Sequence, residues 1–179
     1  MRHHLTVHDG LSALADAYDA FILDLWGVLH DGVRAYPDAV ACLRALQARG
    51  KPLVVLSNAP RPAAQVAAKM RDLGIPDDAF DHLMSSGEDT WRHLAHRSTD
   101  WYRRLGRRMY HLGPERDREM RESVDAERVA AIEDADFILN TGPPNDERTT
   151  TPLVPLLQRA VSRGLPMICA NPDKEIGRA

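Results

Sequence analysis

The feature that most constrains the fold is a short apolar run that ends on a carboxylate, Phe21-Ile22-Leu23-Asp24, with Gly27 close behind it. An apolar run of this length, bounded by glycine, is typical of a buried strand in a parallel sheet. Acids are rarely placed in apolar surroundings without a partner. Because ligands of open α/β sheets bind outside the carboxyl ends of the strands, the pattern places Asp24 where chemistry usually occurs.

A second apolar run, residues 52–58, ends on Ser57 and Asn58. The segment between the two runs has apolar residues at helical spacing, with Pro37 at its start and Gly50 at its end. One strand–helix–strand crossover makes near neighbours in a parallel sheet. We therefore expect Asp24 and Ser57 to face one crevice, although Asp24 alone also fits a turn acid, and Ser57 and Asn58 alone fit turn formers.

Four motifs in this order resemble those of the haloacid dehalogenase superfamily and of its NagD-like branch, which carries a large α/β cap. They are Asp24-x-x-Gly27-Val28-Leu29, the strand ending in Ser57-Asn58, the helix opening Met84-Ser85-Ser86-Gly87, and the segment Asn171-Pro172-Asp173 that follows an apolar run. The resemblance implies a Rossmann-like parallel sheet as an incomplete core, with the beginning of a second α/β domain. We place the core at residues 1–106 and the cap at residues 107–179.

The resemblance also implies roles for individual residues. Asp24 would be the nucleophile that carries a phosphoryl group as an aspartyl phosphate. Ser57 and Asn58 would bind the phosphate oxygens, assisted by the N-terminus of the helix that follows. Magnesium would be held by Asp24 and by the backbone carbonyl of Trp26. The implied activity is hydrolysis of a small phosphate ester.

Two departures from the family pattern bear on this activity. Trp26 stands where the phosphatases usually carry a second Asp that protonates the leaving alcohol, and an indole N–H does not titrate. His30 and Asp31 are the nearby groups considered as substitutes. The sequence also ends at Ala179, before the family's catalytic Lys and acidic metal ligands, so we expect a truncated segment with little phosphatase activity. A sheet without its last strands would expose an apolar edge and favour self-association.

Two alternatives to the phosphatase remain open. Dehalogenases of the superfamily use the same Asp nucleophile and also lack the second Asp, because a halide leaves without a proton. A binding or regulatory relic without catalysis is the other alternative. Substrates of both kinds, and the effect of changing Asp24, distinguish these hypotheses.

Composition limits the partners. A net charge of −3 argues against nucleic acid, and no apolar segment approaches the ~18 residues that a membrane span needs. Cys42 and Cys169 lie in apolar runs and predict two buried thiols rather than a disulfide framework. With no basic and apolar leader at the N-terminus, these features predict a cytoplasmic protein.

The remaining pattern predicts helices over residues 63–73, 88–104, 126–133 and 152–163. It predicts strands over residues 109–113, 137–142 and 167–170. This alternation of strands and helices indicates a second small α/β unit.

Overall fold

The computed structural model describes residues 6–144 and 151–172, and Asp173 of the fourth motif lies outside this part of the chain. Two compact units are present. The first contains the described residues up to Ser57 together with Ala67–Met84, and the second contains Asn58–Val66 and the described residues from Ser85 onward. The proposed core and cap limits, 1–106 and 107–179, stay a prediction.

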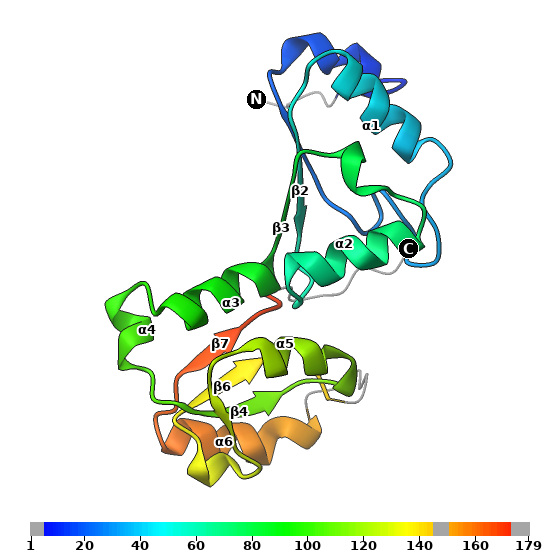
Figure 1. The fold of residues 1–179 in the computed structure, drawn as a ribbon. Helices are drawn as coiled ribbons and strands as arrows, with labels where there is room; N and C mark the ends of the chain where they lie inside the picture. Colours follow the sequence, from blue (N-terminus) through cyan, green and yellow to red (C-terminus); the bar gives the residue numbers. More distant parts are fainter. Residues whose placement is uncertain (1–5, 145–150, 173–179) are drawn as a thin grey trace, which may run out of the picture. The chain divides into compact units, whose positions relative to one another are not determined.

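The first unit is built on a three-stranded sheet with the strand order β1-β2-β3, of which Figure 1 labels β2 and β3. Its strands are β1 (Phe21–Leu23), β2 (Leu53–Ser57) and β3 (His82–Ser85). Helix α1 (Ala39–Ala48) connects β1 to β2, and α2 (Ala63–Asp72) connects β2 to β3. Strands β1 and β2 are parallel, with Leu23 opposite Val55. The predicted crossover over residues 21–57 is therefore present.

The two faces of the first sheet differ in burial. Leu53 and Val55 of β2 are fully buried, as is Leu43 of α1. Because side chains alternate along a strand, Ile22 and Leu56 belong to the opposite face, where their exposed fractions are 71% and 50%. Apolar side chains are thus exposed on this face of the sheet. The self-association expected from an open sheet edge stays a prediction.

The second unit is built on a parallel sheet with the strand order β5-β4-β6-β7. The strands are β4 (Arg108–Leu112), β5 (Glu127–Arg128), β6 (Phe137–Asn140) and β7 (Met167–Cys169). The helices are α3 (Ser86–His96), α4 (Asp100–Arg104), α5 (Arg118–Ser123) and α6 (Val154–Ser162). Short 3-10 turns lie at Leu11–Ala13, Ala15–Ala17, Asp77–Ala79, Glu115–Asp117, Ile132–Asp134 and Thr151–Leu153.

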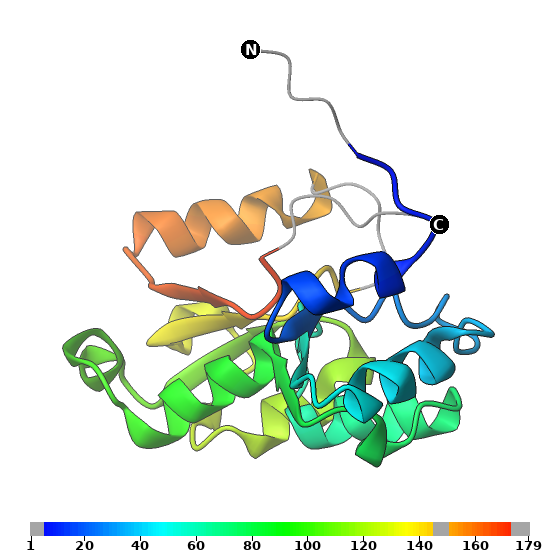
Figure 2. The ribbon, with the colours of Figure 1, turned by 90° about the horizontal axis from the view of Figure 1, so that it is seen from above.

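The second sheet is covered on both faces (Figure 2). Leu94 of α3 and Met120 of α5 share one apolar cluster with Met109 and Phe137 of the sheet. Ala160 of α6 belongs to a second cluster, together with Leu112 and Ile138. Parallel strands between two helical layers confirm the predicted α/β class and the second α/β unit.

Two predicted helices are wrong. The helix over residues 88–104 is interrupted, because Arg97 adopts φ 46° and its guanidinium donates to the carbonyls of Tyr102 and Leu105 at 2.9 and 3.0 Å. The helix over residues 126–133 is replaced by β5, because Val129 N donates to the Met109 carbonyl at 3.0 Å. Of the two cysteines predicted to be buried, Cys169 is exposed and Cys42 is only partly buried. Within the described residues, no helix is both long and apolar enough to cross a bilayer.

One carboxylate holds the start of β4, one of the two inner strands of the second sheet. Asp136 accepts from the backbone N–H of Arg108 at 2.9 Å and from its guanidinium at 2.8 Å. The side chain and backbone of Arg108 together lower the pKa of Asp136 from 3.8 to about 2. Because the pKa is lower in the folded state, the ionised carboxylate stabilises the fold above pH 4, and this stabilisation is lost as the pH falls towards 2.

We expect Asp136→Asn to lower the free energy of unfolding at pH 7 by about 1 kcal/mol, since the pair with Arg108 is partly screened by solvent. The difference between wild type and variant should shrink as the pH is lowered from 4 to 2. Urea unfolding at several pH values measures both effects. Asp125→Asn is the matched control because Asp125 pairs with Arg107 at the open surface, where 72% of the Asp125 side chain is exposed. A loss that does not depend on pH would contradict the assigned role.

Candidate active site

Asp24 follows the last residue of β1, and its side chain is exposed. The backbone N–H of Leu25 donates to Asp24 Oδ1 at 2.7 Å, which orients the carboxylate. Ser57 is the last residue of β2, the parallel neighbour of β1. The structure therefore brings both residues to the carboxyl ends of adjacent strands, while their roles in binding and catalysis stay predictions. Asn58 follows directly and is the first residue of the second unit.

The turn after β1 offers an oxygen ligand beside Asp24. The Leu25 carbonyl accepts from Leu29 N at 2.8 Å and from His30 N at 3.3 Å, and Gly27 N donates to the His30 carbonyl at 2.9 Å. Gly27 has φ 77°, a value that side chains disfavour. None of these bonds uses the Trp26 carbonyl oxygen.

The donor chemistry of this turn fits magnesium. A carboxylate and a backbone carbonyl are both hard oxygen ligands, and Mg²⁺ commonly keeps several waters beside one or two protein carboxylates. The described residues contain no cluster of three or more His, Cys, Asp or Glu side chains suited to a metal. The Asp24 carboxylate and the Trp26 carbonyl are oxygen donors of the kind that this ion prefers, and their binding of magnesium stays a prediction.

The Trp26 side chain lies against the backbone of Gly32. A Cβ added at Gly32 would come within 3.1 Å of Trp26 Nε1, and Gly32 has φ 91°. The indole remains 46% exposed. Trp26 thus packs on its own turn and contributes no titrating proton at the tip of β1.

His30 is buried and held by its own turn. Its Nδ1 accepts from Gly32 N at 2.9 Å, so the neutral ring carries its proton on Nε2. Burial lowers the pKa of His30; Asp31 and Asp24 oppose this shift, whereas Lys69 adds to it. The ring is therefore mainly neutral near pH 7, which disfavours His30 as the general acid that the sequence left open.

Asp31 is held in the ionised form. Its Oδ1 accepts from the backbone N–H groups of Val33 and Arg34, both at 2.8 Å. These bonds lower the pKa of the Asp31 carboxyl. A carboxylate stabilised in this way is a poor proton donor at neutral pH, so neither nearby candidate takes the place of the missing second Asp.

The loop after Ser57 is held by residues whose contacts could not be predicted from the sequence motifs. Glu88 Oε2 accepts from Ala63 N at 3.0 Å, at the first residue of α2. Ser86 Oγ lies 3.1 Å from the Ala59 carbonyl oxygen, and Ser85 Oγ donates to the Arg61 carbonyl. Glu88 thus already accepts from one N–H at the N-terminus of α2. Its carboxylate also offsets part of the positive end of the helix dipole, which is therefore less available to an external anion.

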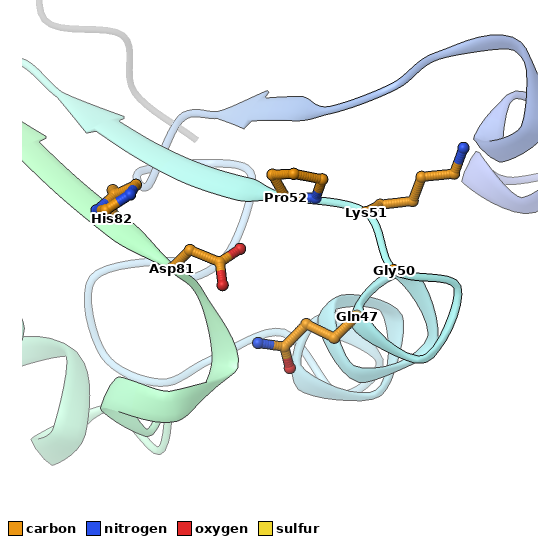
Figure 3. A pocket seen from close by; sticks show the side chains of 6 residues that line it. All are labelled: Gln47, Gly50, Lys51, Pro52, Asp81 and His82. Carbon is orange, nitrogen blue, oxygen red and sulfur yellow. The ribbon is translucent and has the colours of Figure 1, made fainter.

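A shallow pocket of about 450 Å³ lies at the other edge of the first sheet, where β2 and β3 begin (Figure 3). Its lining residues are Gln47, Gly50, Lys51, Pro52, Asp81 and His82. Lys51 Nζ donates to the Tyr18 carbonyl at 2.8 Å, and Asp81 Oδ2 accepts from Leu53 N at 2.7 Å. These groups connect loops to the sheet, at the strand ends opposite to Asp24.

Comparison with known proteins identifies the family. Residues 21–127, more than half of the chain, match the model of the haloacid dehalogenase-like hydrolases. A hydrolase of this family from Brucella suis 1330 is 36% identical, with a TM-score of 0.82 over 97% of this chain and 64% of that one. No curated protein matches the chain significantly.

Two further solved structures are similar. The 4-nitrophenylphosphatase from Thermotoga maritima is 26% identical, with a TM-score of 0.60, and the alignment covers 89% of this chain and 57% of that one. NagD from E. coli K-12 is 25% identical, with a TM-score of 0.57, over 90% of this chain and 59% of that one. The chain thus spans less than two thirds of the length of these relatives. It belongs to the haloacid dehalogenase-like hydrolases, in their NagD-like branch.

Proposed function

We propose that this chain is part of a phosphatase of small phosphate esters that works through an aspartyl phosphate on Asp24. The observation that carries the proposal is the oriented, exposed Asp24 carboxylate at the tip of β1, beside the strand that ends in Ser57. A carboxylate oxygen attacks phosphorus, the ester P–O bond breaks and the alcohol leaves. Water then hydrolyses the aspartyl phosphate, which releases inorganic phosphate and restores Asp24.

Ser57 and Asn58 would bind the non-bridging phosphate oxygens, Ser57 through its hydroxyl and Asn58 through its amide. Asp24 and the Trp26 carbonyl would hold magnesium, which supplies positive charge against the charge of the transferred group. The name of the T. maritima relative, a 4-nitrophenylphosphatase, supports a phosphate ester as the substrate class. Cys42 and Cys169, which form no disulfide in the described chain, support a reducing compartment such as the cytoplasm.

The acidity of the leaving alcohol should determine which phosphate esters are hydrolysed fastest. With Trp26 in place of an acid, no titrating side chain of this turn protonates a departing alkoxide. Esters of acidic alcohols, such as aryl phosphates, should therefore turn over faster than alkyl phosphates. The same observation favours a second candidate, a dehalogenase that uses Asp24 as nucleophile, because a halide needs no proton.

A substrate comparison tests the proposal. The product of the whole reading frame, including any codons beyond residue 179, is assayed with an aryl phosphate, an alkyl phosphate and a short haloacid in the presence of magnesium. Release of phosphate, fastest from the aryl ester, supports the phosphatase. Release of halide alone supports the dehalogenase, and no turnover of any substrate supports a binding or regulatory relic.

We expect Trp26→Asp to raise turnover of the alkyl phosphate by about tenfold or more, since positioned general acids are typically worth 10²–10⁴-fold. The aryl phosphate should respond much less. Trp26 is partly exposed, so the smaller side chain can be accommodated. Trp26→Phe is the control, because it keeps the packing on Gly32 and adds no acid. If Trp26→Asp and Trp26→Phe changed the turnover of both esters to the same extent, the lack of a general acid at this position would not explain slow turnover of alkyl phosphates.

A further inference from the structure

The first turn of α3 and the loop after β2 lie side by side in the second unit. Gly87 N donates to the Ala59 carbonyl at 3.1 Å, and Ala63 N donates to Glu88 Oε2 at 3.0 Å. Between these points, the fully buried Ser85 hydroxyl donates to the Arg61 carbonyl. Backbone groups of Ala59, Arg61 and Ala63 are thus bound by residues of the segment 85–88.

Ser86 extends this contact to a third segment. Its hydroxyl lies within hydrogen-bond distance of two carbonyl oxygens, those of Ala59 and Ala170. Ala170 follows β7 and directly precedes Asn171, the start of the last sequence motif. Because a hydroxyl has a single proton, Ser86 donates to only one of these carbonyls at a time, and the Ala170 oxygen is the nearer, at 2.5 Å against 3.1 Å.

The contact is close and fixed from both sides. A Cβ at Gly87 would lie 2.1 Å from the backbone nitrogen of Arg61, so only glycine allows this approach. Glu88 is 9% exposed, and its other oxygen, Oε1, accepts from Arg92 Nε at 2.8 Å. At the far end of the loop, Arg61 Nε donates to the buried Asp117 at 3.2 Å. A loop held at this many points has little freedom to move independently of α3.

We propose that Ser86 and Glu88 are positioning residues that hold the loop carrying Asn58 in its phosphate-binding conformation. The Ser86 hydroxyl lies between the carbonyl of Ala59, the residue after Asn58, and that of Ala170, and so packs the loop against the segment after β7. Glu88 binds the first N–H of α2. The inference rests on the proposed function, because Asn58 matters only if it binds a phosphate group. The holding contacts themselves do not depend on that function.

The first test measures amide hydrogen exchange of residues 58–63 in the 179-residue chain. We expect Ser86→Ala and Glu88→Ala each to accelerate exchange in this loop by about tenfold, the equivalent of one lost hydrogen bond. Glu88→Gln keeps an oxygen acceptor and should largely restore slow exchange at Ala63. Ser162→Ala is the matched control, because Ser162 Oγ donates to the Arg159 carbonyl at 2.9 Å in α6. Exchange in β6, residues 137–140, should be unchanged in all four variants.

The second test measures binding of orthovanadate, a phosphate analogue, with magnesium present. Faster loop exchange together with several-fold weaker vanadate binding in Ser86→Ala, but not in Ser162→Ala, supports the positioning role. Unchanged loop exchange overturns the role whatever the function is. Faster exchange with unchanged vanadate binding also overturns it and leaves the proposed function intact. Failure of the wild-type protein to bind vanadate, in the whole reading-frame product as well, overturns the proposed function and the positioning role together.

Discussion

Asp24→Asn should abolish turnover of phosphate esters in the product of the whole reading frame. We expect a loss of at least about a thousandfold, the order seen when the nucleophile of a covalent mechanism is removed. Asparagine preserves the shape of the side chain, and its oxygen can still accept from Leu25 N, as Asp24 Oδ1 does at 2.7 Å. The amide has no anionic oxygen to form an ester with phosphorus. The defect is therefore chemical, and the melting temperature should stay close to that of the wild type.

A direct measurement of the covalent site is beryllofluoride trapping, in which BeF₃⁻ occupies the place of the phosphoryl group on a carboxylate. The wild-type protein with magnesium should give a bound fluorine signal by NMR, and Asp24→Asn should give none. Asp19→Asn is the control, since Asp19 is an exposed carboxylate on the chain that leads into β1. Turnover and trapping in Asp24→Asn equal to those of an active wild-type protein would place the reaction at another residue.

The parts of the fold that the sequence predicted correctly depend on local patterns. Apolar runs bounded by Gly, Pro or polar residues marked β2, β4, β6 and β7, and helical spacing between them marked α1, α2 and α6. The placement of Asp24 and Ser57 at one sheet edge followed from the crossover rule, which needs only strand order and direction. Local periodicity and one topological rule were sufficient there.

The failures have a different physical origin. Arg97 ends α3 because its side chain binds carbonyls five and eight residues later, at Tyr102 and Leu105, and nothing in the apolar spacing signals that contact. Residues 127–128 form a strand because β4 offers an edge, so tertiary pairing overrides helical propensity.

At the candidate site, too, contacts between residues far apart in the sequence could not be predicted. Ser86 belongs to the third motif and Glu88 follows that motif directly, yet their partners Ala59 and Ala63 lie more than 20 residues away and contribute only backbone groups. A sequence carries no signal for which backbone groups are bound. The available hint was the type of residue: a buried Glu near the start of a helix needs a donor, and a Gly inside a helix needs a neighbour that approaches closely.

Gly87→Ala should destabilise the second unit by about 2–3 kcal/mol, the upper part of the usual range for overpacking a buried site. Alanine is the better helix former by about 1 kcal/mol, so helix propensity alone predicts the opposite sign. The steric term is larger here because the new Cβ would meet backbone atoms, at 2.1 Å from Arg61 N and 2.5 Å from the Pro60 carbonyl carbon. Backbone atoms, unlike the end of a flexible side chain, cannot rotate away.

Relief of this overlap requires the loop of residues 58–63 to separate from α3, which breaks the bonds from Gly87 N to the Ala59 carbonyl and from Ala63 N to Glu88. Chemical denaturation measures the stability, and hydrogen exchange locates the opening. Gly10→Ala is the matched control, because the nearest atom to its Cβ would be Ser12 Oγ at 3.9 Å, and we expect a change within about 0.5 kcal/mol. A Gly87→Ala variant as stable as the wild type, with slow exchange in residues 58–63, would mean that the loop does not lie against α3. The holding role of Ser86 and Glu88 would then lose its structural basis.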